Sequence, residues 1–182
     1  ASALSRAESA LIAFSASEIG VVYAASRTGM YKSTDNGDTW AQIGTTSSMY
    51  ILGMGIKPNN SNTIVIGKSG GVGLHCSIDG GNSFPATNIT SGFMRQFAWS
   101  ASEPNRIFAV MGSSTSSLLS SNDGVTWAAV GPTGNAWGMY ISPTNSLFML
   151  LAHDNGIYRT TDGGLTWDLA FSGVMKSVAE YG

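Results

Sequence analysis

The sequence predicts an all-β protein, a β-propeller of four-stranded antiparallel blades, and three observations support this prediction. First, a short polar stretch that ends in an aromatic residue occurs four times, with starts 44, 43 and 40 residues apart. Second, runs of strand length rich in β-branched, aromatic and aliphatic residues flank each copy, bounded by Gly, Ser, Asn and Asp. Third, helical periodicity is absent almost everywhere, and only residues 1–10 resemble a helical turn. A repeat of about 40–45 residues with these strands indicates propeller blades.

Each repeat contains the strands of one blade in the same order. The first strands are predicted at residues 10–17, 51–58, 95–102 and 137–143, and the second strands at 21–26, 63–69, 106–112 and 147–153. The third strands are predicted at 29–35, 73–79, 117–123 and 156–162, and short fourth strands follow, such as 39–44 and 166–171. The predicted blades therefore span residues 10–44, 50–88, 94–131 and 136–171, within one propeller domain or propeller segment of residues 1–182. Residues 172–182 would start a fifth blade or supply a closing strand.

The repeated polar stretch, here called the box, has the frame Ser/Thr-x-Asp-x-Gly-x-Ser/Thr-aromatic. The Asp, Gly and aromatic positions hold Asp35, Gly37 and Trp40; Asp79, Gly81 and Phe84; Asn122, Gly124 and Trp127; and Asp162, Gly164 and Trp167. An Asp at the start of a turn accepts hydrogen bonds from backbone N–H groups two or three residues later, and Gly supplies a positive φ. The aromatic residue then anchors the turn to the core. A calcium loop is the alternative, but the second box lacks the second acid and further ligands are missing. We expect a structural box.

The composition argues against several kinds of partner and cofactor. The formal net charge is −2 and the nine Lys and Arg residues are scattered, so we expect no nucleic-acid partner. No apolar run approaches about 20 residues, so we expect no membrane insertion. Cys76 is the single cysteine, and with His75 it supplies only two of the four ligands of a structural zinc site. We therefore predict no metal and no cofactor. Glycosylation triplets at Asn59 and Asn88 are compatible with an extracellular or virion location.

The four boxes resemble Asp-box repeats, also called bacterial neuraminidase repeats. The stretch NGIYRTTDGGLTW at residues 155–167 is similar to the repeat consensus, and residues 56–84 resemble blades of sortilin-type and xyloglucanase-type propellers. The resemblance implies a propeller whose boxes lie away from the ligand face. It does not imply one function, because this repeat occurs in glycosidases, receptors, assembly factors and virion proteins alike.

In a propeller the loops opposite the boxes usually carry the ligand site. These are the connections between the fourth strand of one blade and the first strand of the next, and between the second and third strands of each blade. The candidate ligand-binding residues on this face are Tyr50, Arg95, Trp137, Arg27, His153 and Asp154. Tyr50 and Trp137 are expected to stack on a sugar, and Arg95 to hold an acidic group. Ordinary packing between blades is the alternative role for the two aromatic residues.

Catalysis by the chain alone is not expected. A sialidase needs an Arg triad, a Tyr–Glu pair and an Asp, and the Arg motif of that family is missing. A xyloglucanase-type inverting enzyme needs two facing carboxylates about 6.5–9.5 Å apart, and His153 with Asp154 is the only suggestive pair. We therefore expect a non-catalytic binding or assembly module that contacts a glycan or a protein partner. The alternative is a segment of a sialidase-like or xyloglucanase-like glycoside hydrolase whose catalytic residues lie partly outside this chain.

Two further expectations concern partners. An assembly factor of the photosystem type is a third hypothesis, but such proteins rely on an Arg-rich patch and this chain has few Arg residues. A fifth inner strand at residues 174–181 would leave an unpaired edge, because no blade would follow it. We therefore expect another chain to complete the propeller, or a homodimer; a self-closed four-blade ring is the competing arrangement.

Overall fold

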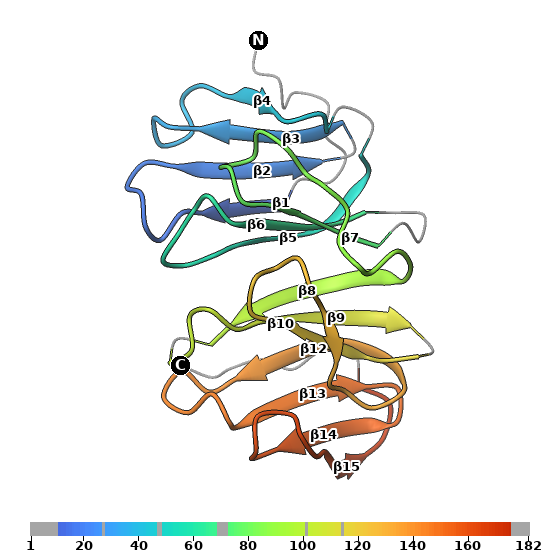
Figure 1. The fold of residues 1–182 in the computed structure, drawn as a ribbon. Helices are drawn as coiled ribbons and strands as arrows, with labels where there is room; N and C mark the ends of the chain where they lie inside the picture. The colour runs from blue at the N-terminus through green and yellow to red at the C-terminus, as the bar shows by residue number, and fades with distance from the viewer. Residues whose placement is uncertain are drawn as a thin grey trace. The chain divides into compact units, whose positions relative to one another are not determined.

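The computed structural model describes residues 11–26, 28–46, 49–68, 73–100, 102–113 and 115–175. Every regular element among these residues is a β-strand, and every strand pair is antiparallel. The chain divides into two compact units, residues 1–91 and 92–182, and each contains two blades (Figure 1). The predicted all-β fold of propeller-type antiparallel blades is confirmed.

The first unit opens with a complete four-stranded blade. Its strands are β1 (Leu11–Phe14), β2 (Val22–Ser26), β3 (Gly29–Ser33) and β4 (Ala41–Ile43), hydrogen-bonded in chain order. The side chains of β2 are buried throughout, because strands pair on both of its edges and apolar residues cover it. The boundaries agree with the predicted strands, although the first strand is shorter than the predicted range 10–17.

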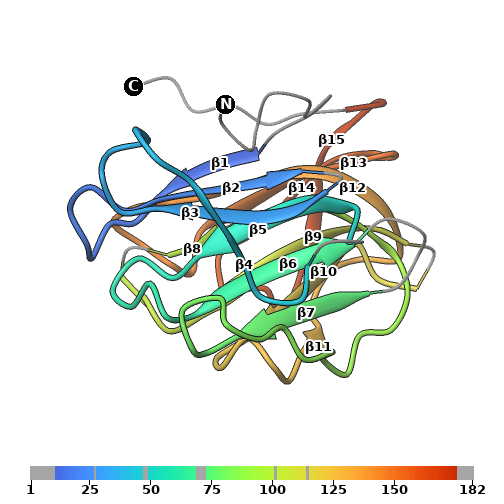
Figure 2. The same ribbon diagram turned by 90° about the horizontal axis from the view of Figure 1, so that it is seen from above.

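The second blade has three strands instead of the predicted four. These are β5 (Ile51–Ile56), β6 (Ile64–Lys68) and β7 (Leu74–Ser77), which follow one another in Figure 2. The segment after the box follows β7 only through an isolated bridge between His75 and Ala86 and a few backbone hydrogen bonds. Pro85 lies directly before Ala86 and has no N–H to donate, which interrupts a regular fourth strand.

The second unit contains two four-stranded blades. The third blade comprises β8 (Phe93–Trp99), β9 (Ile107–Ser113), β10 (Leu118–Ser121) and β11 (Ala128–Ala129). The fourth comprises β12 (Gly134–Ile141), β13 (Met149–His153), β14 (Gly156–Thr160) and β15 (Asp168–Ser172). The start of β12 also pairs with the end of β9, through Gly134 with Ser113 and Asn135 with Gly112, and this joins the two blades at one end. Residues 176–182, which hold most of the predicted fifth inner strand, lie outside the described residues.

The core of each unit lies between its two blades. In the first unit, Tyr23 and Met30 of the first blade pack with Ile64, Ile66 and Phe84 of the second. In the second unit, Phe108, Val110 and Leu118 of the third blade pack with Met149 and Leu151 of the fourth. The strand side chains therefore form a packed layer between neighbouring blades, as expected when sheets stack face to face.

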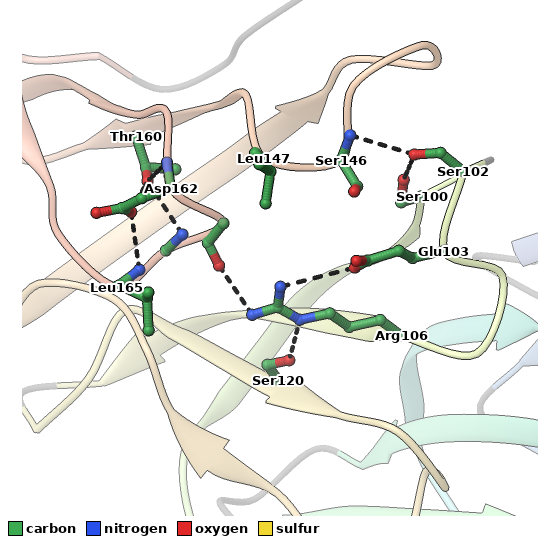
Figure 3. Close-up of polar contacts among 12 residues, drawn as sticks. Ser100, Ser102, Glu103, Arg106, Ser120, Ser146, Leu147, Thr160, Asp162 and Leu165 are labelled. Carbon is green, nitrogen blue, oxygen red and sulfur yellow. Dashed lines mark hydrogen bonds and ion pairs between the residues drawn. The ribbon is translucent and has the colours of Figure 1, made fainter.

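An equivalent hydrogen bond joins the two blades of each unit at the turns between their first and second strands. In the first unit the backbone N–H of Ser61 donates to the hydroxyl of Ser17 at 3.1 Å, and the Ser61 hydroxyl donates to Glu18. In the second unit the backbone N–H of Ser146 donates to the hydroxyl of Ser102 at 3.2 Å (Figure 3). Both residues of the second pair lie 85 positions after those of the first. The two units thus share this hydrogen bond between their blades.

Candidate functional site

The box turns bond to themselves, as their sequence suggested. In the first box Asp35 accepts the backbone N–H of Thr39 at 2.9 Å and the hydroxyls of Ser33 and Thr39. The Ser33 hydroxyl accepts the N–H of Gly37 at 2.9 Å. These bonds stabilise the ionised carboxylate, and those from Ser33 and Thr39 lower the pKa of Asp35 to about 2. Both carboxylate oxygens are therefore occupied by the turn.

The second and fourth boxes repeat this geometry. Asp79 accepts from Ser77 and Ser83, and the bonds from Ser83 are the main reason that its pKa is lowered to about 2. Asp162 accepts the hydroxyls of Thr160 and Thr166 and the backbone N–H groups of Leu165 and Thr166. Figure 3 shows its bonds with Thr160 and Leu165. None of these carboxylates projects toward a ligand, because the turn itself supplies their partners.

The third box corrects the sequence alignment. Asn122 was expected at the Asp position, but Asp123 fills it, accepting the Ser121 hydroxyl at 2.9 Å and the N–H groups of Val125 and Thr126 at 2.8 and 2.7 Å. Ser121 pairs with Ile107 as Ser33 pairs with Val22, which fixes the equivalence of the two boxes. The third box is therefore one residue shorter than the others between its Asp and its Gly. A gap in one copy cannot be seen from an alignment that assumes equal lengths.

The box aromatic residues differ in burial. Trp127 and Phe84 are buried, with 4% and 6% exposure, whereas Trp40 and Trp167 are half-buried. The indole N–H of Trp127 donates to Gly124 and that of Trp40 to Gly37, each within its own turn. Trp167 instead donates to the Val130 carbonyl of the neighbouring blade at 2.7 Å. Anchoring of the turn is common to all three Trp residues, while deep burial is not.

Four of the predicted ligand-binding residues belong to the second unit and lie at the end of its blades opposite the boxes. Arg95 is in β8, Trp137 is in β12, His153 ends β13, and Asp154 begins the turn to β14. Three of them are in contact. We call Arg95, Trp137 and Asp154, together with Asn135, the loop-face cluster.

The geometry of the loop-face cluster is specific. The guanidinium carbon of Arg95 lies 3.7 Å from the centroid of the Trp137 ring, a cation–π contact. The indole N–H of Trp137 donates to one oxygen of Asp154 at 2.6 Å, and the amide of Asn135 donates to the other at 2.8 Å. The backbone N–H of Asp154 donates to the Asn135 carbonyl at 3.1 Å, which holds the turn against β12. The indole is therefore fixed at its polar edge, and the exposed Arg95 lies over its face.

Two strand irregularities bring the cluster together. The pairing of β8 with β9 shifts register between Met94 and Gln96, and the pairing of β12 with β13 shifts between Ala136 and Gly138. Arg95 and Trp137 are the skipped residues, and a bulge of this kind redirects its side chain. Gly112 leaves room for the arrangement, because a Cβ there would lie 3.0 Å from two guanidinium nitrogens of Arg95.

His153 was predicted to contact a ligand, but its side chain forms hydrogen bonds inside the protein. Its side chain is 1% exposed. Nδ1 accepts the backbone N–H of Asn155 at 3.2 Å, so the neutral ring donates from Nε2 to the Thr133 carbonyl at 3.0 Å. Tyr158 packs edge-on against the ring, with centroids 5.1 Å apart. With both nitrogens bonded inside the protein, His153 holds the loops on either side of the cluster.

Two hydrogen bonds hold the Asp154 carboxylate in place and favour its ionised form. Hydrogen bonds from Trp137, and then from Asn135, lower the pKa of its carboxyl group below the usual range. An acid that stays ionised in this way is a poor proton donor near neutral pH. The carboxylate instead orients the indole and balances the charge of Arg95.

The two remaining predicted residues are not part of the loop-face cluster as described. Tyr50 precedes β5 in the first unit and is half-buried. Arg27 lies outside the described residues. Asn135, by contrast, was not among the predicted binding residues. Its part in the cluster depends on the pairing of β12 with β9, for which the sequence gives no direct signal.

The described residues also bear on two other kinds of site. They contain no helix that is long and apolar enough to cross a membrane. Within the same residues, no three His, Cys, Asp or Glu side chains are grouped so that they could hold a metal ion.

Comparison with solved structures identifies similar folds. The chain matches an ancestral GH74 enzyme with a TM-score of 0.75 and 25% identity, over 86% of this chain and 23% of the enzyme. It matches the GH74 enzyme of Niastella koreensis with a TM-score of 0.72 and 18% identity, over 88% of this chain and 29% of the enzyme. A structure of YCF48 bound to D1 peptide matches with a TM-score of 0.60 and 17% identity, over 83% of this chain and 50% of that one.

These matches concern the fold and part of each protein. The chain spans only about a quarter of the length of the first two structures and half of the third. No model of a known protein family matches the sequence, and no curated protein does. The expected similarity to Asp-box propellers, including the xyloglucanase type, is thus confirmed at the level of structure.

Proposed function

We propose that this chain is a non-catalytic binding module and that its loop-face cluster binds a glycan carrying a carboxylate, such as a uronic acid. One observation carries the proposal: Arg95 is exposed and stacked on an indole whose own N–H is fixed by Asp154. A planar guanidinium held in one orientation presents its N–H edge to a carboxylate in the paired geometry that such groups favour. Because the side chain is already ordered, binding loses less rotamer freedom.

Binding is favoured over the alternative, a segment of a glycoside hydrolase. The other described carboxylates lie in the box turns, in the turns between first and second strands, or at Asp168, where β15 begins after its box. All of these are at the opposite ends of the strands from Asp154. An inverting hydrolase needs two carboxyl groups about 6.5–9.5 Å apart, one of them protonated. Among the described residues, Asp154 has no such partner on the loop face, and its lowered pKa disfavours the protonated form.

The test compares two arginine variants that lose the same charge. Arg95→Gln should weaken binding of a glucuronate-containing oligosaccharide by about 10-fold or more, the effect of a charge-assisted hydrogen bond worth about 1.5–3 kcal/mol. Arg159→Gln is the control, because Arg159 is exposed on β14 away from the cluster. Isothermal titration calorimetry measures the dissociation constant of each variant for the acidic oligosaccharide and for its carboxyl-reduced neutral form.

Three results separate the possibilities. Loss in Arg95→Gln alone, together with weak binding of the neutral form, supports the proposal. Equal losses in the two arginine variants would indicate attraction by net charge only and contradict it. Absence of binding to the acidic oligosaccharide by the unmodified chain would contradict it as well.

A protein partner is the second candidate, and the exposure of Phe93 favours it. Phe93 lies two residues before Arg95 in β8 and is 54% exposed. Exposed aromatic and Arg residues close together are typical of the centre of protein interfaces. The YCF48 structure, which contains a bound peptide, shares the fold. Phe93→Ala should weaken a protein complex while leaving oligosaccharide binding unchanged, and pull-down by the full chain with mass spectrometry would identify the partner.

A further inference from the structure

Three of the four boxes make a backbone bond that joins them to another turn of their own blade. The residue after the box Asp has a positive φ, 59° for Asn36, 74° for Gly80 and 76° for Gly163. In this conformation its N–H points to the turn between the first and second strands. The N–H groups donate to the carbonyls of Gly20, Asn62 and Leu147, respectively, at 2.9, 3.0 and 3.0 Å.

The third box lacks the residue that makes this bond. Gly124 follows Asp123 directly, and its N–H donates to the Ser121 hydroxyl at 2.9 Å. Asn105 is the counterpart of Gly20, 85 positions later, and within the described part of the chain no backbone N–H donates to its carbonyl. The two turns of the third blade are therefore not joined as they are in the other blades.

A hollow of about 720 Å³ lies between these two turns of the third blade. The turn between β8 and β9 forms one wall, with Glu103, Pro104 and Asn105, and the shortened box forms the other, with Asn122. Val130, after β11, contributes apolar surface. Asn122, which has no part in the hydrogen bonds of its own turn, is exposed there. The volume is within the range of small-molecule sites, about 300–1,000 Å³.

The charges in the hollow are already neutralised within the protein. Arg106 lies 3.7 Å from Glu103, donates from Nε to the Ser120 hydroxyl at 3.1 Å, and donates from Nη2 to the Gly163 carbonyl at 2.8 Å (Figure 3). Its guanidinium is thus occupied in tying the third blade to the fourth, so an anionic ligand would compete with Glu103 for it. The polar side chains that remain in the lining are the amides of Asn105 and Asn122, which both donate and accept.

We infer that this hollow is a second binding site, separate from the loop-face cluster, and that it takes a neutral sugar ring such as a hexopyranose. Sugar hydroxyls both donate and accept, which matches the amides of Asn105 and Asn122. The C–H face of the ring packs on Pro104 and Val130. The shortened box creates the site, because the missing residue would otherwise join the two turns that wall it.

The test restores the missing residue. Insertion of one glycine between Asp123 and Gly124 gives the third box the length of the others and lets the new N–H reach the Asn105 carbonyl. Binding of glucose, galactose, mannose and xylose is measured by saturation-transfer NMR and titration on the full chain, where dissociation constants of about 1 mM are detectable. The insertion is expected to reduce affinity at least about 10-fold with an unchanged or higher melting temperature.

Substitutions provide the controls. Asn122→Ala removes one lining amide from an exposed position and should weaken binding several-fold, so it tests the site even if the insertion variant does not fold. Thr34→Ala, at the same position of the first box, should have no effect. Arg95→Gln should also have none, which distinguishes this site from the loop-face cluster.

Two outcomes would overturn the inference. One is binding of these sugars that is equal in the unmodified chain and in both the insertion and Asn122→Ala variants. The other is no binding of any of the four sugars at about 10 mM, including the case in which only a peptide binds along the free edge of β11.

Discussion

Trp127 and Trp40 allow burial to be separated from hydrogen bonding in the box. Each occupies the aromatic position of its box, and each donates its indole N–H to the carbonyl of its box glycine, at 2.8 and 2.9 Å. They differ in burial, because Trp127 is 4% exposed and packs 6.2 Å from the ring of Phe97, whereas Trp40 is half-buried. A difference in the free energy of unfolding between Trp127→Ala and Trp40→Ala therefore reports burial.

The magnitude follows from the area and the cavity. Removal of a buried Trp costs about 3–5 kcal/mol, since the transfer free energy and the cavity both contribute. A half-buried indole with the same hydrogen bond should cost clearly less, because part of its surface is already in water. For a chain of this size each kcal/mol corresponds to roughly 2–4 °C, so Trp127→Ala should lower the melting temperature by about 6–20 °C.

Calorimetry suits the assay, because removing a Trp changes the fluorescence signal itself. Unfolding of both variants and of the unmodified chain is followed at one scan rate, with far-UV circular dichroism confirming β-structure. Trp127→Ala should melt well below Trp40→Ala. Equal melting temperatures for the two variants would refute the argument that the third box is anchored by burial of its aromatic residue.

Two other predictions concern the boxes and one tight turn. Because the folded pKa of Asp35 and Asp79 is about 2, below the usual value near 3.9, their contribution to stability is present above about pH 4 and is lost as pH falls toward 2. The double variant Asp35→Asn with Asp79→Asn should show a flatter dependence of melting temperature on pH between about 5 and 2, and an unchanged slope would contradict this. Gly156→Ala should prevent the fourth blade from forming, because φ is +141° and a Cβ would lie 1.8 Å from the Phe171 carbonyl oxygen. Gly37→Ala is the matched control, with a positive φ but only Trp40 nearby at 3.7 Å, and proteolysis should detect opening of the chain in the first variant alone.

The candidate site was only partly predictable. Arg95, Trp137 and Asp154 were expected on one face because blade topology places the loops between particular strands at the same end. Their mutual contact was not predictable, since it depends on two bulges that skip Arg95 and Trp137. His153 was expected to meet a ligand, but its two nitrogens are bonded to loops that come near it only in the folded chain.

The sequence by itself determined the blades. Strand-length runs, turn residues and a box that bonds within eight residues act locally, so their positions follow from nearby residues alone. The tertiary structure decided what depends on distant partners: the packing between blades, the shift from Asn122 to Asp123, which the pairing of Ser121 with Ile107 fixes, and the loop-face cluster. Strand register and side-chain direction are set by pairing between residues up to 23 positions apart, such as Asn135 with Gly112. A one-residue bulge or gap changes both while leaving the local pattern almost unaltered.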